Sequence, residues 1–484
     1  MEDPAKTRSY ISTKSHEGTN SFDPSVTVDQ TSTIPATASA GTGTVSYLTG
    51  FFFEKLSTWG VEARGIQPVA VEDRTDTHFI KLFFVWFSAN MSILSFATGT
   101  LGPAVFGLGL RDSCLLILFF NLLYALPSAY FSTWGSKLGL RQLCASRYAF
   151  GFYGAMVPST LTVLGAVGFC ILNNIVTFCG LKVLNWYQNC AWVPLIIVFV
   201  IAAGVSGKDL VDPPVAPATA AQVLSFGATI AGFTASWAII SSDYTVYFHP
   251  RVSSKRWVSW PRGIFNHVQI TLQCLGAAAA ISAPYVPSWE AGYTDGNVGG
   301  LVYAMLSSVG KFGKVLMVFL SLSVTANNAL SVYSMGIALQ TLIPRLVVVP
   351  RYVFSVISTA LIILLSIVGQ HKFYATLSNF LGIIGYWAGA WIAVIGVEHL
   401  YFRNRDFSLY DLRCWNTPSR LPLGAAALGA SALSFALVIP SMSQVWYTGP
   451  IARKTGDIGF EVATTVTALF YVPLRHLEKR WRGF

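Results

Sequence analysis

Long apolar stretches separated by short polar ones make up most of the chain after residue 78. Most of them can hold about 20 consecutive helical residues, the length that spans a bilayer. Lipid offers no partner for free backbone groups, so we expect an all-α polytopic membrane protein. The pattern predicts about eleven spans, at residues 79–108, 113–134, 154–181, 191–205, 223–248, 264–284, 315–343, 353–369, 373–401, 423–440 and 458–473.

The first sixty residues lack this pattern. They are polar and rich in Ser, Thr, Gly and Pro, apart from a short amphipathic stretch at 47–59. Such a composition cannot form a core, so residues 1–60 are expected to be a disordered cytoplasmic tail. Residues 61–484 then form one transmembrane domain. No cleavable signal peptide is visible, and the first span is expected to serve as the insertion signal.

Composition supports the membrane assignment and excludes several functions. Of the 484 residues, 53% are hydrophobic and 11% are charged, outside the range of soluble proteins. The net charge of +10 does not indicate nucleic-acid binding, because the Lys and Arg residues stand in small groups beside apolar segments. The sequence contains no metal-ligand spacing, catalytic triad or phosphate-binding loop. We therefore expect neither an enzyme nor a bound cofactor or metal.

The basic loops predict an orientation. A cytoplasmic N-terminus places the basic loop at 137–147 inside, as the positive-inside rule requires. If every later segment crosses once, the basic stretches at 251–262, 403–420 and 475–482 fall outside, which contradicts the same rule. One further crossing between Gly154 and Val223 would correct all of them. The sequence therefore predicts that a crossing is missing there.

Helix-breaking residues interrupt two of the predicted spans. Residues 95–103 contain Gly99, Gly102 and Pro103, and residues 231–237 contain Gly232. Breaks within a membrane occur where freed backbone groups line protein or a watery cavity, and paired broken helices are typical of a transporter's central site. Close helix packing explains Gly232 equally well. We expect a break in the first span and leave the second open.

Amide side chains lie inside the apolar segments, as the pairs Asn173–Asn174 and Asn327–Asn328. Amides can recognise the edge of a heterocyclic base, and aromatic rings can stack on its faces. Phe169 lies one turn before Asn173 and therefore on the same helix face. Hydrogen bonding between helices is the alternative role for these amides.

Asp243 is the only carboxylate in the apolar body of segment 223–248. A buried carboxylate can relay a proton. Its position near His249 and Arg251 favours a gate or an interfacial salt bridge instead.

The chain resembles the fungal purine-cytosine permease branch of nucleobase-cation-symport family 1. The resemblance rests on RGI at 64–66, WFSANMSILSFATGTLGP at 86–103, GLRQLCASRYAFGFYG at 139–154, GLKVLNWYQNCAWVP at 180–194, SWAIISSDYTVYFHP at 236–250 and TANNALSVYS at 325–334. It implies a five-plus-five inverted-repeat fold with broken first and sixth helices. It also implies proton-coupled uptake of cytosine and purines, in a multi-pass protein of the plasma membrane.

The resemblance also implies site residues. Carried over by position, the substrate-binding residues are Ser88 or Ser95, Phe169, Asn173, Trp237, Asn327 and Ser331. Phe169 stands where the family usually has tryptophan, and Ser331 where it usually has a second amide. Losing that amide would cost a cytosine site roughly 1 to 3 kcal/mol. The resemblance therefore implies a purine, cytosine or a related planar heterocycle as the solute, and the two departures leave a B6-type vitamin or a pathway metabolite open as the alternative.

Two further expectations follow from the resemblance. The run from Asn174 to Tyr187 passes straight through the position of the family's fourth helix, so the chain has one span fewer than the family's twelve. A transport-inactive pseudotransporter is therefore a second alternative. The cation position on the eighth helix reads Thr325–Ala326 where two hydroxyls are needed. A hard cation would lose a ligand, which favours coupling to protons over sodium.

Overall fold

The computed structural model describes residues 65–166, 181–251, 254–343, 345–346, 349, 353–354, 357 and 373–482. The predicted N-terminal tail, Phe169 and Asn173, and most of the predicted span at 353–369 lie outside the described residues.

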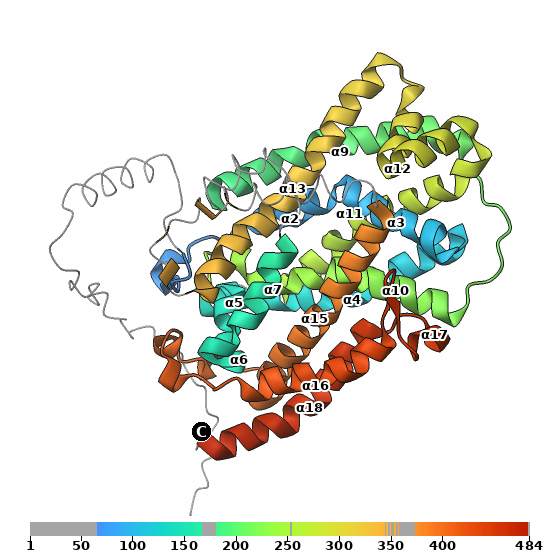
Figure 1. Ribbon diagram of the computed structural model, residues 1–484. Helices are drawn as coiled ribbons and strands as arrows, with labels where there is room; N and C mark the ends of the chain where they lie inside the picture. Colours follow the sequence, from blue (N-terminus) through green and yellow to red (C-terminus); the bar gives the residue numbers. More distant parts are fainter. Residues whose placement is uncertain are drawn as a thin grey trace, which may run out of the picture. The chain divides into compact units, whose positions relative to one another are not determined.

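Within these ranges the regular structure is helical except for one short β-hairpin (Figure 1). The long helices are α2 (Phe79–Asn90), α3 (Ile93–Phe106), α4 (Leu110–Leu138), α7 (Met156–Ala166), α9 (Leu181–Ser206), α10 (Ala220–Thr234), α11 (Ser254–Ser282), α12 (Pro287–Ser307), α13 (Lys311–Leu342), α15 (Phe373–Val397), α16 (Ala425–Ser441) and α18 (Gly459–Arg482). The shorter elements used below are α5 (Gln142–Ala145), α6 (Arg147–Gly154), the 3-10 helices η3 (Ala235–Ile239) and η4 (Ser241–Tyr244), the strands β1 (Ser443–Gln444) and β2 (Tyr447–Thr448), and α17 (Ala452–Thr455).

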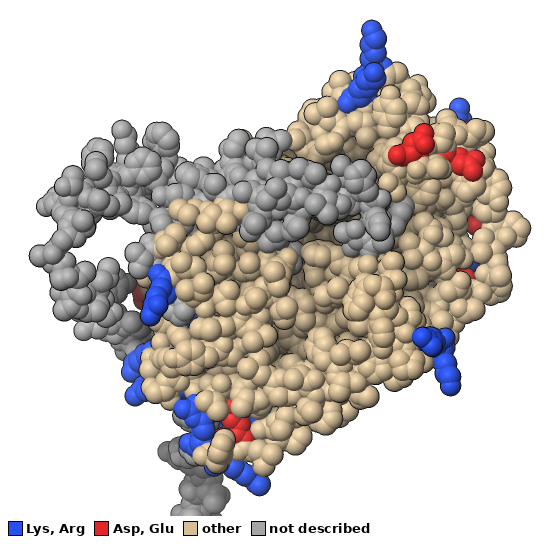
Figure 2. All heavy atoms as spheres, in the orientation of Figure 1, with Lys and Arg blue, Asp and Glu red and all other residues tan. Residues whose placement is uncertain are grey.

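The described helices suit a membrane. Five are long and apolar enough to cross it, and two bent helix pairs raise the number to seven if each pair counts as one span. On the face in Figure 2 the visible charged side chains stand at the margins, and the broad centre carries none. An all-α polytopic membrane protein is thus confirmed.

The first span is broken, but not at the predicted residues. α2 and α3 meet at 51° across Met91 and Ser92. Gly99 and Pro103 lie inside α3 instead. A Cβ at Gly99 would overlap the carbonyl oxygen of Gln273 on α11, and one at Gly276 would overlap the carbonyl of Phe96. The prediction misplaced the break because the glycine there serves close backbone packing.

α13 satisfies the backbone groups freed by this break. Ser323 Oγ accepts a hydrogen bond from the Ile93 backbone N–H at 3.0 Å, and Asn327 Nδ2 donates to the Ala89 carbonyl at 2.9 Å. Within α3, Ser95 Oγ donates to a second freed carbonyl, that of Asn90, at 2.7 Å. A broken helix is stable at membrane depth only when such groups are paired, so these side chains fix the break in place.

The second break lies within the predicted stretch. α10 ends at Thr234, and η3 and η4 continue the chain as 3-10 turns. Gly232 also packs against the Leu381 carbonyl of α15, so both interpretations of this glycine hold. Thr234 Oγ1 donates to Asn121 Oδ1 at 2.7 Å, and Gln269 Nε2 donates to the same oxygen at 2.6 Å. This buried amide network ties the end of α10 to α4 and α11.

The predicted spans leave residues 285–314 between them, outside any span, but most of this stretch is helical. It forms α12, which follows α11 at 115° and begins at a proline, Pro287. Proline suits the first turn of a helix because that turn needs no N–H from it.

The basic loops lie together, as the charge pattern predicts. Lys137 Nζ donates to the Pro250 carbonyl at 2.6 Å, and Arg147 Nη1 donates to Asn416 Oδ1 at 2.8 Å. Three predicted segments separate the first pair of loops, at 154–181, 191–205 and 223–248. An odd number of single crossings would place these loops on opposite sides. The contact therefore argues against three single crossings between these loops, and the missing crossing and the number of spans stay predictions.

Candidate functional site

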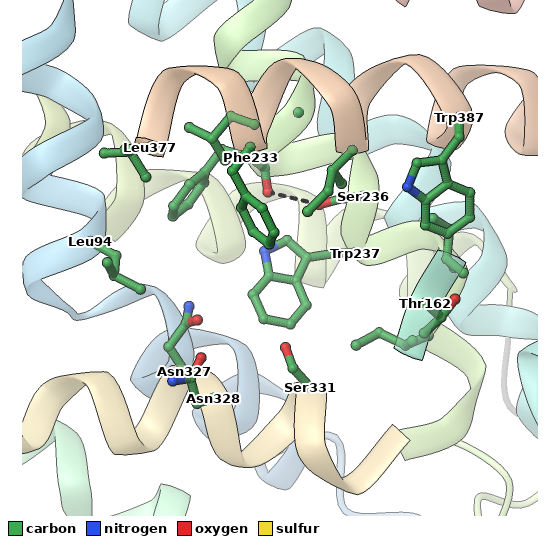
Figure 3. A pocket seen from close by; sticks show the side chains of 16 residues that line it. Leu94, Thr162, Phe233, Ser236, Trp237, Asn327, Asn328, Ser331, Leu377 and Trp387 are labelled. Carbon is green, nitrogen blue, oxygen red and sulfur yellow. Dashed lines mark hydrogen bonds between the residues drawn. The ribbon is translucent and has the colours of Figure 1, made fainter. Parts of the chain in front are cut away.

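A cavity of about 190 Å³ lies where the two broken helices meet α7, α13 and α15. Figure 3 shows it enclosed by Leu94 of α3, the aromatic residues of α10 and η3, the polar residues of α13 and the apolar face of α15. None of its sixteen lining residues is charged. A cavity of this kind suits a small neutral ligand that is recognised by a few polar groups.

Trp237 occupies the centre of this cavity. The η3 turn that follows the break in α10 carries its indole toward α13 (Figure 3). Trp86 of α2 meets the indole edge-on with ring centroids 5.4 Å apart, and Tyr244 meets Trp86 in the same way at 5.6 Å. Edge-to-face contacts of this kind fix the orientation of a ring. Trp237 is thus a rigid aromatic surface inside the site.

α13 supplies the polar wall. Asn327, Asn328 and Ser331 all line the cavity, and Figure 3 shows their side chains on its α13 side. The Nδ2 group of Asn327 is committed to the Ala89 carbonyl. Asn328 Nδ2 is buried and has no hydrogen-bond partner within the described part of the chain. A buried donor without an acceptor is costly, so a ligand oxygen or ring nitrogen beside it would gain a hydrogen bond that the protein alone does not make.

The structure brings together three of the predicted site residues, Trp237, Asn327 and Ser331. Ser88, Ser95 and Thr325 are buried but are not among the lining residues. Ser95 pairs with the broken helix as described above. The substrate-binding and coupling roles of these residues stay predictions.

Asp243 lies in η4, away from the lining of the cavity. Its Oδ1 accepts from the backbone N–H of Gln142 at 2.8 Å, at the start of α5. Arg141 Nη1 donates to the Asp243 carbonyl at 2.7 Å and to the Tyr333 hydroxyl of α13 at 2.9 Å. Asp243 thus joins the end of the second broken helix to the 139–154 loop, a position that suits the predicted gate.

Several lining residues were not predicted. Asn328 belongs to the amide pair singled out in the sequence but was left out of the predicted site. Phe233 and Ser236 flank Trp237, and their nearness to the break was the available signal. α15 contributes a whole wall, which includes Phe380 and Trp387. Nothing in its apolar sequence distinguishes the face toward the cavity from the face toward lipid.

No group of three or more His, Cys, Asp and Glu side chains that could hold a metal ion occurs in the described ranges. The chemistry available at the cavity is therefore stacking on aromatic rings and hydrogen bonding to amides and hydroxyls.

Comparison with known proteins agrees with this geometry. The family described as "Permease for cytosine/purines, uracil, thiamine, allantoin" matches residues 68–185 and 174–462. The chain belongs to this permease family. It is therefore a multi-pass membrane transporter and not an enzyme. The two matched stretches share residues 174–185. These shared residues lie in the run from Asn174 to Tyr187, where the family's fourth helix is predicted to be missing.

Individual relatives cover nearly the whole permease. Purine-cytosine permease FCY2 of Saccharomyces cerevisiae is 34% identical over 477 residues, which cover 90% of this chain and 89% of that one. Vitamin B6 transporter TPN1 of the same yeast is 25% identical, with 89% and 90% covered.

The fold of the permease is that of a solved transporter. The structure of Mhp1, a nucleobase-cation-symport-1 family transporter in a closed conformation with bromovinylhydantoin bound, matches with a TM-score of 0.61 at 15% identity. The match covers 86% of this chain and 96% of that one. The predicted five-plus-five inverted-repeat fold is thereby confirmed.

Proposed function

We propose that this permease imports a small, flat, uncharged heterocycle, a purine or cytosine, together with protons. The observation that carries the proposal is the uncharged cavity, in which a fixed indole faces an unpartnered amide donor. A nucleobase has both a face that stacks and an edge that accepts hydrogen bonds. The name of the 34% identical relative, a purine-cytosine permease, supports the same substrate class.

In the proposed complex the base stacks on Trp237, and its edge points to α13. Asn328 Nδ2 donates to a ring nitrogen or carbonyl oxygen of the base, and the Ser331 hydroxyl donates or accepts beside it. As the resemblance implies, Phe169 would add a second aromatic ring for stacking on the base, and Asn173 would add a further amide for its edge. Ser88, Ser95 and Thr325 act from the first and eighth helices behind this layer.

Coupling to protons is favoured by the hydroxyls near the first break. Thr325 is followed by Ala326, so the position offers one hydroxyl where a sodium site would use two. The nearby Ser323 hydroxyl already accepts from the Ile93 N–H. We place the permease in the plasma membrane with its N-terminus in the cytoplasm, because the clustered basic loops then face inward.

Uptake by cells that lack their own nucleobase permeases tests this function. Cells expressing the chain should accumulate radiolabelled adenine, hypoxanthine or cytosine above vector controls. The uptake should fall with a protonophore and should not change when choline replaces sodium. No uptake of any of the three, and no inhibition by them of another solute's uptake at millimolar concentration, would refute the nucleobase assignment.

A B6-type vitamin is the second candidate substrate. It is favoured by the 25% identity to a vitamin B6 transporter over 89% of this chain, and by the hydroxyl of Ser331 in the polar wall. Labelled pyridoxine in the same cells separates the two substrates. Background uptake of every solute, at normal surface expression, would instead indicate the transport-inactive pseudotransporter.

A further inference from the structure

A second polar cluster lies on the far side of α15 from the cavity. Asp457, in the loop before α18, is 5% exposed. Its Oδ2 accepts hydrogen bonds from the Tyr386 hydroxyl, from the Ser443 backbone N–H at 2.9 Å and from Gln444 Nε2 at 3.4 Å. Its Oδ1 accepts from the Gly459 N–H at 2.9 Å. The carboxylate thus joins α15, the β-hairpin and the start of α18.

A second carboxylate follows four positions later on α18. The Tyr124 hydroxyl of α4 donates to Glu461 Oε1 at 2.6 Å. The other oxygen, Glu461 Oε2, is buried and has no hydrogen-bond partner in the described structure, and the same holds for Gln444 Oε1 in the same cluster. The cluster therefore has more buried acceptors than donors.

No cation offsets the charge of this pair among the described residues. Neither carboxylate forms an ion pair there. The side chains that face the two carboxylates from the elements packed against them are all neutral: Tyr124, Ser225, Tyr386 and Gln444. The basic residues of the neighbouring α17, Arg453 and Lys454, are exposed. Two like charges sharing a buried site disfavour each other, so one proton would remove a charge and add a donor. Burial raises the pKa of the Asp457 carboxyl despite its hydrogen bonds.

The cluster is connected to the wall of the cavity through α15. Asn379 Oδ1 of this helix accepts from the Val445 backbone N–H of the hairpin at 2.8 Å, and Gln444 packs against Gly382. Asn379, Gly382 and Tyr386 share one face of the helix by its 3.6-residue period, and the cavity-lining residues, which include Phe380 and Trp387, share the opposite face. A change in the hydrogen bonds of Asp457 therefore acts on the same helix that closes the cavity.

We infer that Asp457 and Glu461 form a proton-binding site that controls the position of α15, an inference that rests on the transport function proposed above. With the C-terminus and the 403–420 loop in the cytoplasm, the hairpin faces outside, so the proton comes from external water. A hydronium ion gives its proton to a carboxylate oxygen, so that one O–H bond of the hydronium breaks, one O–H bond forms on the carboxyl group, and a water molecule is released. The protonated oxygen accepts the Tyr386 and Gln444 hydrogen bonds poorly, which releases α15 from the hairpin and opens the cavity to the outside.

The first test measures α15 directly, without any substrate. In the full-length chain, Phe380→Cys is labelled from outside with a membrane-impermeant thiol reagent at roughly pH 5 and pH 8. Because only the thiolate reacts, each rate is divided by the rate of Tyr285→Cys at the same pH, a position whose parent residue is exposed. The corrected labelling rate of Phe380→Cys should be higher at low pH. Adding Asp457→Asn should remove this dependence on pH. The same dependence in the presence of Asp457→Asn and Glu461→Gln together would overturn the inference.

The second test uses labelled adenine uptake, with wild type, Asp457→Asn, Tyr386→Phe and the matched control Glu290→Gln, whose parent carboxylate is exposed. Uptake by wild type and by the control should fall by up to about tenfold per pH unit above the pKa of the site. The Asp457→Asn profile should be flat. A flat profile in Asp243→Asn, with normal dependence in Asp457→Asn, would assign the proton to the other carboxylate and refute the inference. Absence of adenine uptake in wild type would count against the proposed function alone, because the labelling test needs no substrate.

Discussion

Truncation of Trp237 to alanine should weaken substrate binding more than any other change to an aromatic residue of the cavity. The indole lies in the centre of the site and is held edge-on by Trp86 at 5.4 Å. Stacking of a base on such a ring is worth about 1 to 3 kcal/mol. Since about 1.4 kcal/mol corresponds to a factor of ten, Trp237→Ala should raise the apparent KM about tenfold or more. Trp237→Phe keeps a ring in place and should raise it only modestly.

The assay is initial-rate uptake of labelled nucleobase across a concentration series, normalised to the amount of protein at the cell surface. Normalisation matters because Trp237 is 8% exposed, and deleting a large buried ring also destabilises the fold, by about 3 to 5 kcal/mol in typical cores. Trp186→Ala is the matched control, since that indole is 68% exposed on α9. The control should transport with an unchanged KM.

One result would refute the reasoning. If Trp237→Ala transports like the parent at equal surface level, the ring only fills space. The stacking site and the nucleobase-type assignment then fail together.

Four further outcomes are expected. Asn328→Leu removes the unpartnered donor and should raise KM for nucleobases about five- to a hundredfold, measured in the same uptake series. Ser323→Ala leaves the Ile93 N–H of the broken helix without its acceptor. The free energy of unfolding should fall by about 1 to 3 kcal/mol, measured as a lower melting temperature of the purified permease. Gly99→Ala should abolish surface expression, because its Cβ overlaps a backbone carbonyl, whereas Gly204→Ala, which meets nothing within 4 Å, should express normally. Dissipating the proton gradient should stop uptake while removal of sodium leaves it unchanged, and the opposite pattern in isotope uptake would contradict proton coupling.

The sequence predicted the membrane helices well because lipid imposes a single demand on every span. An apolar segment of sufficient length must pair its backbone internally, so hydropathy alone located α4, α9, α13 and α15. The same signal missed α12, whose acidic residues made it look like a loop. Hydropathy reports the solvent around a segment and says little about the backbone of a polar one.

The candidate site was predicted in part. The amide pair of α13 stood out because polar side chains are unusual in an apolar span, although only Asn327 was assigned to the site. Trp237 was assigned from the family resemblance, by its position after the second break. The wall made by α15 was not predicted, since Leu377 and Phe380 resemble lipid-facing residues in composition. The first break was misplaced because Gly99 has two possible uses, and only the position of Gln273 on α11 decides between them.

The reciprocal contact of α3 with α11 restricts how the permease can move. Gly99 receives the carbonyl of Gln273, and Gly276 receives the carbonyl of Phe96, so each backbone occupies the space where the other lacks a side chain. Sliding one helix along the other, even by one residue, would press a carbonyl against a neighbouring Cβ. During a transport cycle the two helices must travel as one rigid body. The distance between labels on α3 and α11 should therefore stay constant while distances across the cavity to α15 change.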